Sequence, residues 1–172
     1  LDSQMVDRGR QQRGQDELGS LFPKLNRSLY RSLDQRPFVC LQMAVIDVDS
    51  RAFCYTNSGL PYPYHYSDAD LVELPLDAYP LGVSGDTEFE VREGHLDVGD
   101  YLVFCSDGIA EAENENGDQF GYESTASALL NACREGLSSA EVIDFLFSAV
   151  GDFRGSVPQG DDMTCVVVRV AD

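Results

Sequence analysis

Two acidic segments stand next to strand-like runs and could bind a metal ion. Asp107-Gly108 directly follows the apolar run Tyr101–Cys105. Asp161-Asp162 directly precedes the β-branched run Met163–Val170. If the two runs form neighbouring antiparallel strands, the end of one lies beside the start of the other. We therefore expect the carboxylates of Asp107 and Asp161 to meet at one edge of a sheet.

Carboxylates held this close repel each other, and a hard divalent cation such as Mg²⁺ or Mn²⁺ relieves the repulsion. Gly108 and Gly160 would let the backbone pass close to such a metal. His65 and His95 are far apart in sequence and have no zinc-binding spacing, so a transition-metal site built on histidine or cysteine ligands is not expected. A second interpretation stays open, because Asp-Gly and Gly-Asp-Asp are also common turn sequences.

Other catalytic chemistries find little support in the sequence. It contains no GxSxG elbow, no Walker loop and no GxGxxG motif. A cysteine nucleophile would need a histidine partner that neither histidine obviously supplies. The acidic run of Glu111, Glu113, Glu115 and Asp118 is typical of a solvated loop.

Composition limits the class of protein. The chain has 172 residues, of which 43% are hydrophobic, and this is enough for one globular domain. Its net charge of −18 disfavours binding to nucleic acid or to anionic membranes. No stretch approaches the roughly 20 apolar residues of a membrane span, and the five cysteines form no CxxC pair. These features predict a soluble protein of the reducing cytoplasm.

The pattern of apolar residues predicts an α+β domain. Residues 1–20 show no apolar period and contain three glycines, which indicates a flexible arm or linker. A helix with a leucine face is expected over Pro23–Leu33. Strands are expected near 38–47, 52–57 and 87–92, in addition to those next to the two acidic segments.

Two helices follow in the second half of the chain. One is expected over Glu123–Arg134, and the second begins at a capping box formed by Ser138 and Glu141. Strands before and after a pair of helices are typical of layered α+β folds. The whole of 21–172 is therefore read as one domain.

Several short motifs occur in an order that points to one family. They are Phe38-Val39, Tyr55–Gly59, Pro80–Val83, Leu96–Asp100 leading to Ser106–Ala112, Asn116–Gly121, and Gly160–Thr164. In this order the chain resembles, from about Leu25 to Val170, the SpoIIE/RsbU-like branch of the metal-dependent (PPM) serine/threonine protein phosphatases. The resemblance implies an α-β-β-α sandwich, in which two antiparallel sheets are flanked by helices.

The resemblance also implies an activity, a cofactor and a site. The family uses a binuclear Mn²⁺ or Mg²⁺ centre to hydrolyse phosphoserine or phosphothreonine on partner proteins, often anti-anti-sigma factors. By their place in the motifs, Asp107 and Asp161 resemble metal-ligating catalytic aspartates. Gly108 belongs to the same turn, and Glu111 and Asp162 resemble residues that hold metal-bound water.

The chain departs from the family pattern at two points. The family carries a Gly-Asp motif and an Asp-x-x-Gly motif before the first helix, and nothing in residues 1–24 matches them. The domain is then incomplete at its amino-terminal end, or it does not catalyse. Leu60 also stands where the family usually has histidine. At this point the chain resembles RssB-like response-regulator output domains, which are catalytically degenerate sigma-factor adaptors.

Three hypotheses follow. The first is a phosphatase output domain of a bacterial response regulator. The second is a binding module or adaptor for a sigma factor or an anti-sigma antagonist. The third concerns residues 1–36, which carry seven basic and five acidic side chains in an otherwise acidic chain and could act as a dimerisation or signalling helix. A homodimer is therefore one further expectation.

Overall fold

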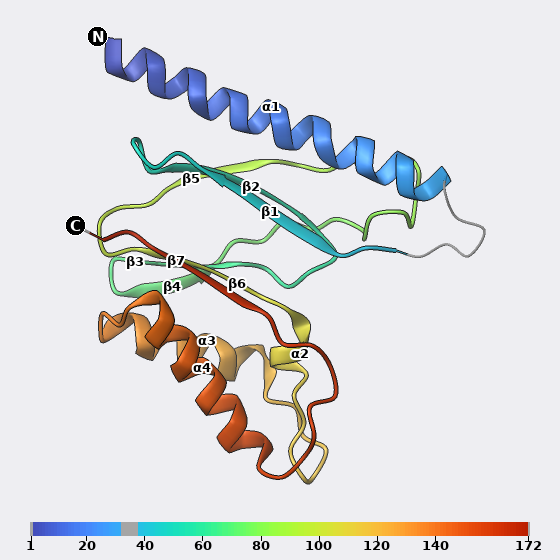
Figure 1. Cartoon of the computed structure of the whole chain (residues 1–172), viewed down its shortest axis with the longest axis vertical. Coiled ribbons are helices and arrows are strands. Elements are labelled where there is room, and N and C mark those ends of the chain that lie inside the picture. The colour runs from blue at the N-terminus through green and yellow to red at the C-terminus, as the bar shows by residue number, and fades with distance from the viewer. Residues whose placement is uncertain (1, 32–37, 172) are drawn as a thin grey trace. The chain divides into compact units, whose positions relative to one another are not determined.

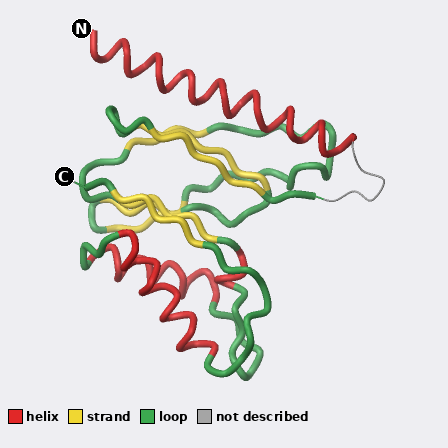
Figure 2. The backbone as a smooth tube through the Cα atoms, in the orientation of Figure 1, coloured by secondary structure: helices red, strands yellow, loops and turns green. Residues whose placement is uncertain are grey.

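The computed structural model describes residues 2–31 and 38–171, with side chains from Gln12 onward. The chain forms two compact units. The first unit contains Leu1–Leu60 and Leu76–Leu96, and the second contains Pro61–Pro75 and Asp97–Asp172. Figure 1 labels the elements of both units, and Figure 2 shows their helices and strands.

The first unit is a three-stranded antiparallel sheet with one long helix. Its elements are α1 (Asp2–Arg31), β1 (Leu41–Ile46), β2 (Ala52–Ser58) and β5 (Arg92–His95), and the strand order is β1-β2-β5. β1 and β2 form the predicted hairpin, with Leu41 opposite Ser58. The Asp47 carboxylate closes its turn by accepting the Ser50 N–H at 2.8 Å. The strand expected over 87–92 is displaced, because β5 begins only at Arg92.

Helix α1 occupies the segment for which a flexible arm was expected, and the domain boundary expected at residue 20 falls inside it. Gly14, Leu18, Phe22 and Asn26 repeat every four residues and are all buried. A Cβ on Gly14 would lie 3.1 Å from Cys54 Sγ of β2, so this glycine allows the helix to approach the sheet. The glycines of residues 1–20 therefore belong to a helix, and the prediction of a linker there was wrong.

The beginning and the apolar face of the expected helix also need correction. Pro23 lies inside α1 and not in its first turn, while Leu33 lies outside the described residues. Phe22 contacts Phe89 edge-on, with ring centroids 5.6 Å apart, and Leu25 and Leu29 pack with it. These three residues of the face therefore pack within their own unit, and the expected homodimer stays a prediction.

The second unit is a four-stranded antiparallel sheet with three helices. Its strands are β3 (Tyr64–Ser67), β4 (Asp70–Glu73), β6 (Tyr101–Cys105) and β7 (Cys165–Arg169), in the order β4-β3-β6-β7. Its helices are α2 (Asp107–Ala110), α3 (Gly121–Arg134) and α4 (Ser139–Arg154). Figure 1 shows α3 and α4 along one face of this sheet.

The core of the second unit lies between the sheet and its helices. β6 has β3 and β7 as neighbours, and its buried Val103 packs in one cluster with Leu129 of α3 and Leu146 of α4. The predicted capping box is confirmed at the start of α4. Ser138 Oγ accepts the Glu141 N–H at 3.3 Å, and Glu141 Oε2 accepts the Ser138 N–H at 2.8 Å.

The fold class predicted from the sequence is confirmed: the protein is α+β, with two antiparallel sheets flanked by helices. Among the helices that the structure describes, none combines the length and the apolar character needed to cross a bilayer.

Candidate functional site

The two acidic segments lie side by side where β6 ends and β7 begins. The last residue pair of the two strands is Cys105 opposite Cys165. One residue further, the Ser106 N–H donates to the Thr164 carbonyl at 2.9 Å. The Ser106 hydroxyl accepts the Thr164 N–H at 2.9 Å and donates to the Asp162 carbonyl at 3.0 Å. Ser106 therefore extends the pairing beyond the strands, up to the acidic residues.

Gly108 lies against the backbone of the other acidic segment. A Cβ on Gly108 would clash with the carbonyl oxygen of Asp162 and would lie 3.5 Å from the carbonyl carbon of Asp161. Only glycine fits at position 108 without a shift of one backbone. The close approach expected for Gly160 does not occur, because a Cβ there would meet nothing within 4 Å.

Each of the two aspartates is positioned by its own turn. Asp107 is the first residue of α2 and is partly exposed, and its Oδ1 accepts the Gly108 N–H at 3.0 Å. Asp161 is exposed, and its Oδ1 accepts the Asp162 N–H at 2.7 Å. Gln159 Nε2 donates to the Asp161 carbonyl at 2.7 Å. Both side chains are thus held near the backbone and are accessible from solvent, where a solvated cation could reach them.

A hollow of about 370 Å³ opens beside Gly108. The residues that line it are Gly108, Glu111, Ala112, Glu113, Gln119, Val157, Pro158, Gly160 and Asp161. A smaller hollow of about 280 Å³ is lined by Gln159, Gly160, Asp161 and Asp162. The structure therefore brings together four of the five residues that the sequence singled out. Asp107 lies next to Gly108 in the chain but lines neither hollow.

Tyr122 is a residue of this region that the sequence analysis did not identify. Burial raises the pKa of the Tyr122 phenol, and the negative charges of Glu111, Asp107 and Glu73 raise that pKa further. The charges of Glu111 and Asp107 thus both raise the pKa of the Tyr122 phenol, which lies in the first turn of α3. No motif around Tyr122 indicates this role, because the proximity depends on how α3 packs.

The described side chains do not complete a metal site. Among residues 12–31 and 38–171, no group of three or more His, Cys, Asp or Glu side chains is placed so that it could hold a metal ion. Asp107 and Asp161 offer the hard oxygen donors that Mg²⁺ and Mn²⁺ prefer, but two carboxylates are too few to hold a pair of cations. His65 Nε2 contacts Asp100 Oδ2 at 3.1 Å within the second unit, and this pair is largely buried.

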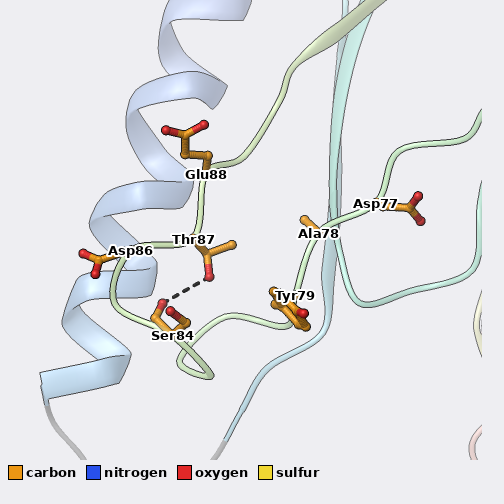
Figure 3. A pocket seen from close by; sticks show the side chains of 7 residues that line it. All are labelled: Asp77, Ala78, Tyr79, Ser84, Asp86, Thr87 and Glu88. Carbon is orange, nitrogen blue, oxygen red and sulfur yellow. Dashed lines mark hydrogen bonds between the residues drawn. The ribbon is translucent and has the colours of Figure 1, made fainter.

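A larger hollow, of about 580 Å³, belongs to the first unit and contains none of the residues that the sequence predicted (Figure 3). Two of its lining residues are hydrogen-bonded to each other, since Thr87 Oγ1 donates to the Ser84 carbonyl at 3.2 Å. The carboxylates of Asp77, Asp86 and Glu88 point in different directions in Figure 3 and do not converge on one point. This hollow therefore offers no built cation site.

Comparison with known proteins identifies relatives of the chain. Residues 4–171 match the family model for Stage II sporulation protein E (SpoIIE). The chain is 33% identical over 99 residues to the phosphoserine phosphatase RsbU of Bacillus subtilis (strain 168), an alignment that covers 56% of this chain and 30% of RsbU.

Solved structures show the same fold. The SiaA-PP2C domain of Pseudomonas aeruginosa matches with a TM-score of 0.74 and 21% identity, over 88% of this chain and 60% of that one. The phosphatase domain of SpoIIE from Bacillus subtilis, presoaked with Mn, matches with a TM-score of 0.61 and 22% identity, over 87% of this chain and 65% of that one. The chain thus spans less than two thirds of each of these relatives.

Proposed function

The chain belongs to the Stage II sporulation protein E (SpoIIE) family, and from this premise we propose that it is the phosphatase output domain of a bacterial regulatory protein of the response-regulator type. Its reaction is the hydrolysis of phosphoserine or phosphothreonine on a partner protein, with Mn²⁺ or Mg²⁺ as cofactor. The relatives RsbU and SpoIIE are a phosphoserine phosphatase and a protein with a phosphatase domain.

One observation carries the proposal. The Ser106 hydroxyl bonds both to Thr164 and to Asp162, and it fixes the segment of Asp107 beside the segment of Asp161. If the two acidic segments were only turns at the ends of two strands, neither the Ser106 contact nor a glycine at position 108 would be needed. The juxtaposition of the two segments supports the proposal that Asp107 and Asp161 provide oxygen donors to the same metal centre.

Each residue has a role in the proposed site. Asp107 and Asp161 contribute oxygen donors to the metal, and Gly108 keeps the two backbones close enough for both to do so. Glu111 and Asp162 orient water at the edge of the site. A divalent cation there supplies Lewis-acid stabilisation of the phosphoryl oxygens. Because the described donors are too few for two cations, the active site needs further donors from outside the described residues.

The proposed partner is a phosphoprotein such as an anti-anti-sigma factor. A surface with a net charge of −18 repels a phosphorylated protein unless cations offset the charge locally. Metal loading is then required for substrate binding as well as for the reaction. The expected dependence on Mn²⁺ should consequently appear in substrate affinity, and not only in turnover.

The test is release of phosphate from a phosphoserine protein, or from p-nitrophenyl phosphate, by the longest native form of the protein with Mn²⁺. We expect activity that an Asp107→Ala, Asp161→Ala double variant lacks. A Gln12→Ala variant, changed at an exposed position of α1, is the matched control and should keep full activity. Equal phosphate release by the native protein and the double variant would exclude the phosphatase.

A second candidate function is a catalytically degenerate adaptor that binds a sigma factor or an anti-sigma antagonist without turnover. It is favoured by the lack of a group of three metal-ligating side chains among the described residues, and by Leu60. Titration of Mn²⁺ into the 172 residues should show millimolar binding or none under either hypothesis. If the longest native form also binds no Mn²⁺ but still binds a sigma factor, the adaptor is the correct function.

A further inference from the structure

Two cysteines face each other across the end of β6 and β7. Cys105 is directly opposite Cys165, and their Sγ atoms are 4.0 Å apart. Both side chains lie on the face of the sheet that packs against α3 and α4. Cys105 is 6% exposed, whereas Cys165 is partly exposed on β7, the edge strand.

The register shows which kind of pair this is. Ser106 and Thr164, the next pair after the two cysteines, are hydrogen-bonded through the backbone, and so are Asp100 and Val170, where Asp100 is five positions before Cys105. Since hydrogen-bonded and non-hydrogen-bonded pairs alternate along antiparallel strands, Cys105 and Cys165 form a non-hydrogen-bonded pair. The Cα atoms of such pairs lie about 4.5 Å apart, which is within the range of about 4.4 to 6.8 Å found in disulfides.

We propose that Cys105 and Cys165 are an oxidation site, at which hydrogen peroxide or another peroxide converts the two thiols into a cross-strand disulfide. The Sγ atoms must approach from 4.0 Å to about 2.05 Å, and rotation of the side chains provides this movement within one residue pair. This site is separate from the acidic site and does not depend on phosphatase activity.

The chemistry balances with the peroxide as the only oxidant. The more exposed thiol, Cys165, attacks one peroxide oxygen, so that an S–O bond forms and the O–O bond breaks. The other oxygen takes the Cys165 proton and leaves as water, or as an alcohol where the peroxide is organic. Cys105 then attacks the sulfur of the resulting sulfenic acid. The S–S bond forms, the S–O bond breaks, and hydroxide leaves and takes the Cys105 proton as a second water. Two electrons pass from the thiols to the peroxide.

The sheet register gives no other cysteine of a described strand a thiol partner opposite it. Cys54 lies opposite Val45 of β1 and Glu93 of β5. Cys133 is buried in α3. Among the cysteines of the described strands, Cys105 and Cys165 are therefore the pair that can form a disulfide directly across the sheet.

The disulfide would have a structural consequence at the acidic site. It joins the last residue pair before the Ser106 and Thr164 contacts that hold the two acidic segments together. Oxidation would tie the two strands at the point where their pairing ends. It should lower local opening of that end, which hydrogen exchange of the Ser106 and Thr164 amides measures.

The experiment treats the folded full chain with hydrogen peroxide, blocks remaining thiols with N-ethylmaleimide and identifies linked peptides by mass spectrometry. We expect one intramolecular link, between Cys105 and Cys165, with two of the five thiols lost and recovered on addition of dithiothreitol. Slower exchange of the Ser106 and Thr164 amides should accompany the link. Oxidation in denaturant should give a mixture of pairings, because the link depends on the fold.

Two variants complete the test. Cys165→Ser, at a partly exposed position, should abolish the link, and its thermal melting shows whether the variant remains folded. Cys40→Ser, also at a partly exposed position, is the matched control and should form the link as the native chain does. Five retained thiols, a link between other cysteines, or a link only between two chains would overturn the proposal.

Discussion

The α-carbon of Gly108 lies so close to the carbonyl oxygen of Asp162 that no side chain fits between them. The two residues are 54 positions apart in the sequence, and the contact exists only because β6 and β7 pair up to their ends. The distance between the two acidic segments therefore depends on having a glycine at position 108, in the first turn of α2.

Gly108→Ala should destabilise the second unit by about 1–3 kcal/mol, because the added methyl group displaces the backbone of Asp162. Urea unfolding measures the loss. Gly160→Ala is the matched control, since its methyl group would meet nothing within 4 Å. Equal unfolding midpoints for the two variants would contradict the close approach.

The phenol of Tyr122 should respond to the acidic residues. Its pKa is raised by burial and by nearby negative charges, so Asp107→Asn or Glu111→Gln should lower the pKa. The measurement is an NMR titration of the protein labelled with ¹³C-tyrosine. Glu123→Gln, next in the sequence, is the control and should leave the pKa of Tyr122 nearly unchanged. If the pKa of Tyr122 is the same in Asp107→Asn as in the native protein, the Asp107 carboxylate does not lie near the Tyr122 phenol.

Stability should depend on pH through the capping box. Hydrogen bonds from the Ser138 side chain and backbone hold the pKa of Glu141 below its ordinary value of 4.5. Because the folded pKa is the lower one, the stabilisation is present above pH 4.5 and is lost as the pH falls through the folded pKa. The difference in urea midpoint between the native protein and Glu141→Ala should therefore become smaller as the pH falls below 4.5. A difference that stays constant into acid would show that Glu141 contributes nothing through its charge.

Helix α1 should be a stable part of the first unit. Leu18→Ala removes a side chain that is 1% exposed and should cost about 2–5 kcal/mol of unfolding free energy. Lys24→Ala, at an exposed position of the same helix, is the control and should cost less than about 0.5 kcal/mol. Hydrogen exchange provides an independent measurement. Unprotected amides around Leu18 would restore the interpretation of this segment as a flexible arm.

The sequence by itself determined the elements whose signals are local. The apolar run of β6, the β-branched run of β7 and the Ser138–Glu141 capping box follow from side-chain pattern and hydrogen-bonding chemistry within a few residues. It also located the acidic segments next to the strand ends, so their meeting needed only the assumption that β6 and β7 are antiparallel. The structure confirms that pairing.

Tertiary structure decided what depends on packing between distant segments. From the sequence alone, Gly14 is typical of a linker. In the structure a glycine is needed there because helix α1 comes close to Cys54 of β2. Tyr122 reaches the field of Asp107 and Glu111 only because α3 packs beside α2. Cys105 and Cys165 become a pair only through strand register. Such contacts join residues that are far apart in the chain, and no local pattern of residues encodes them.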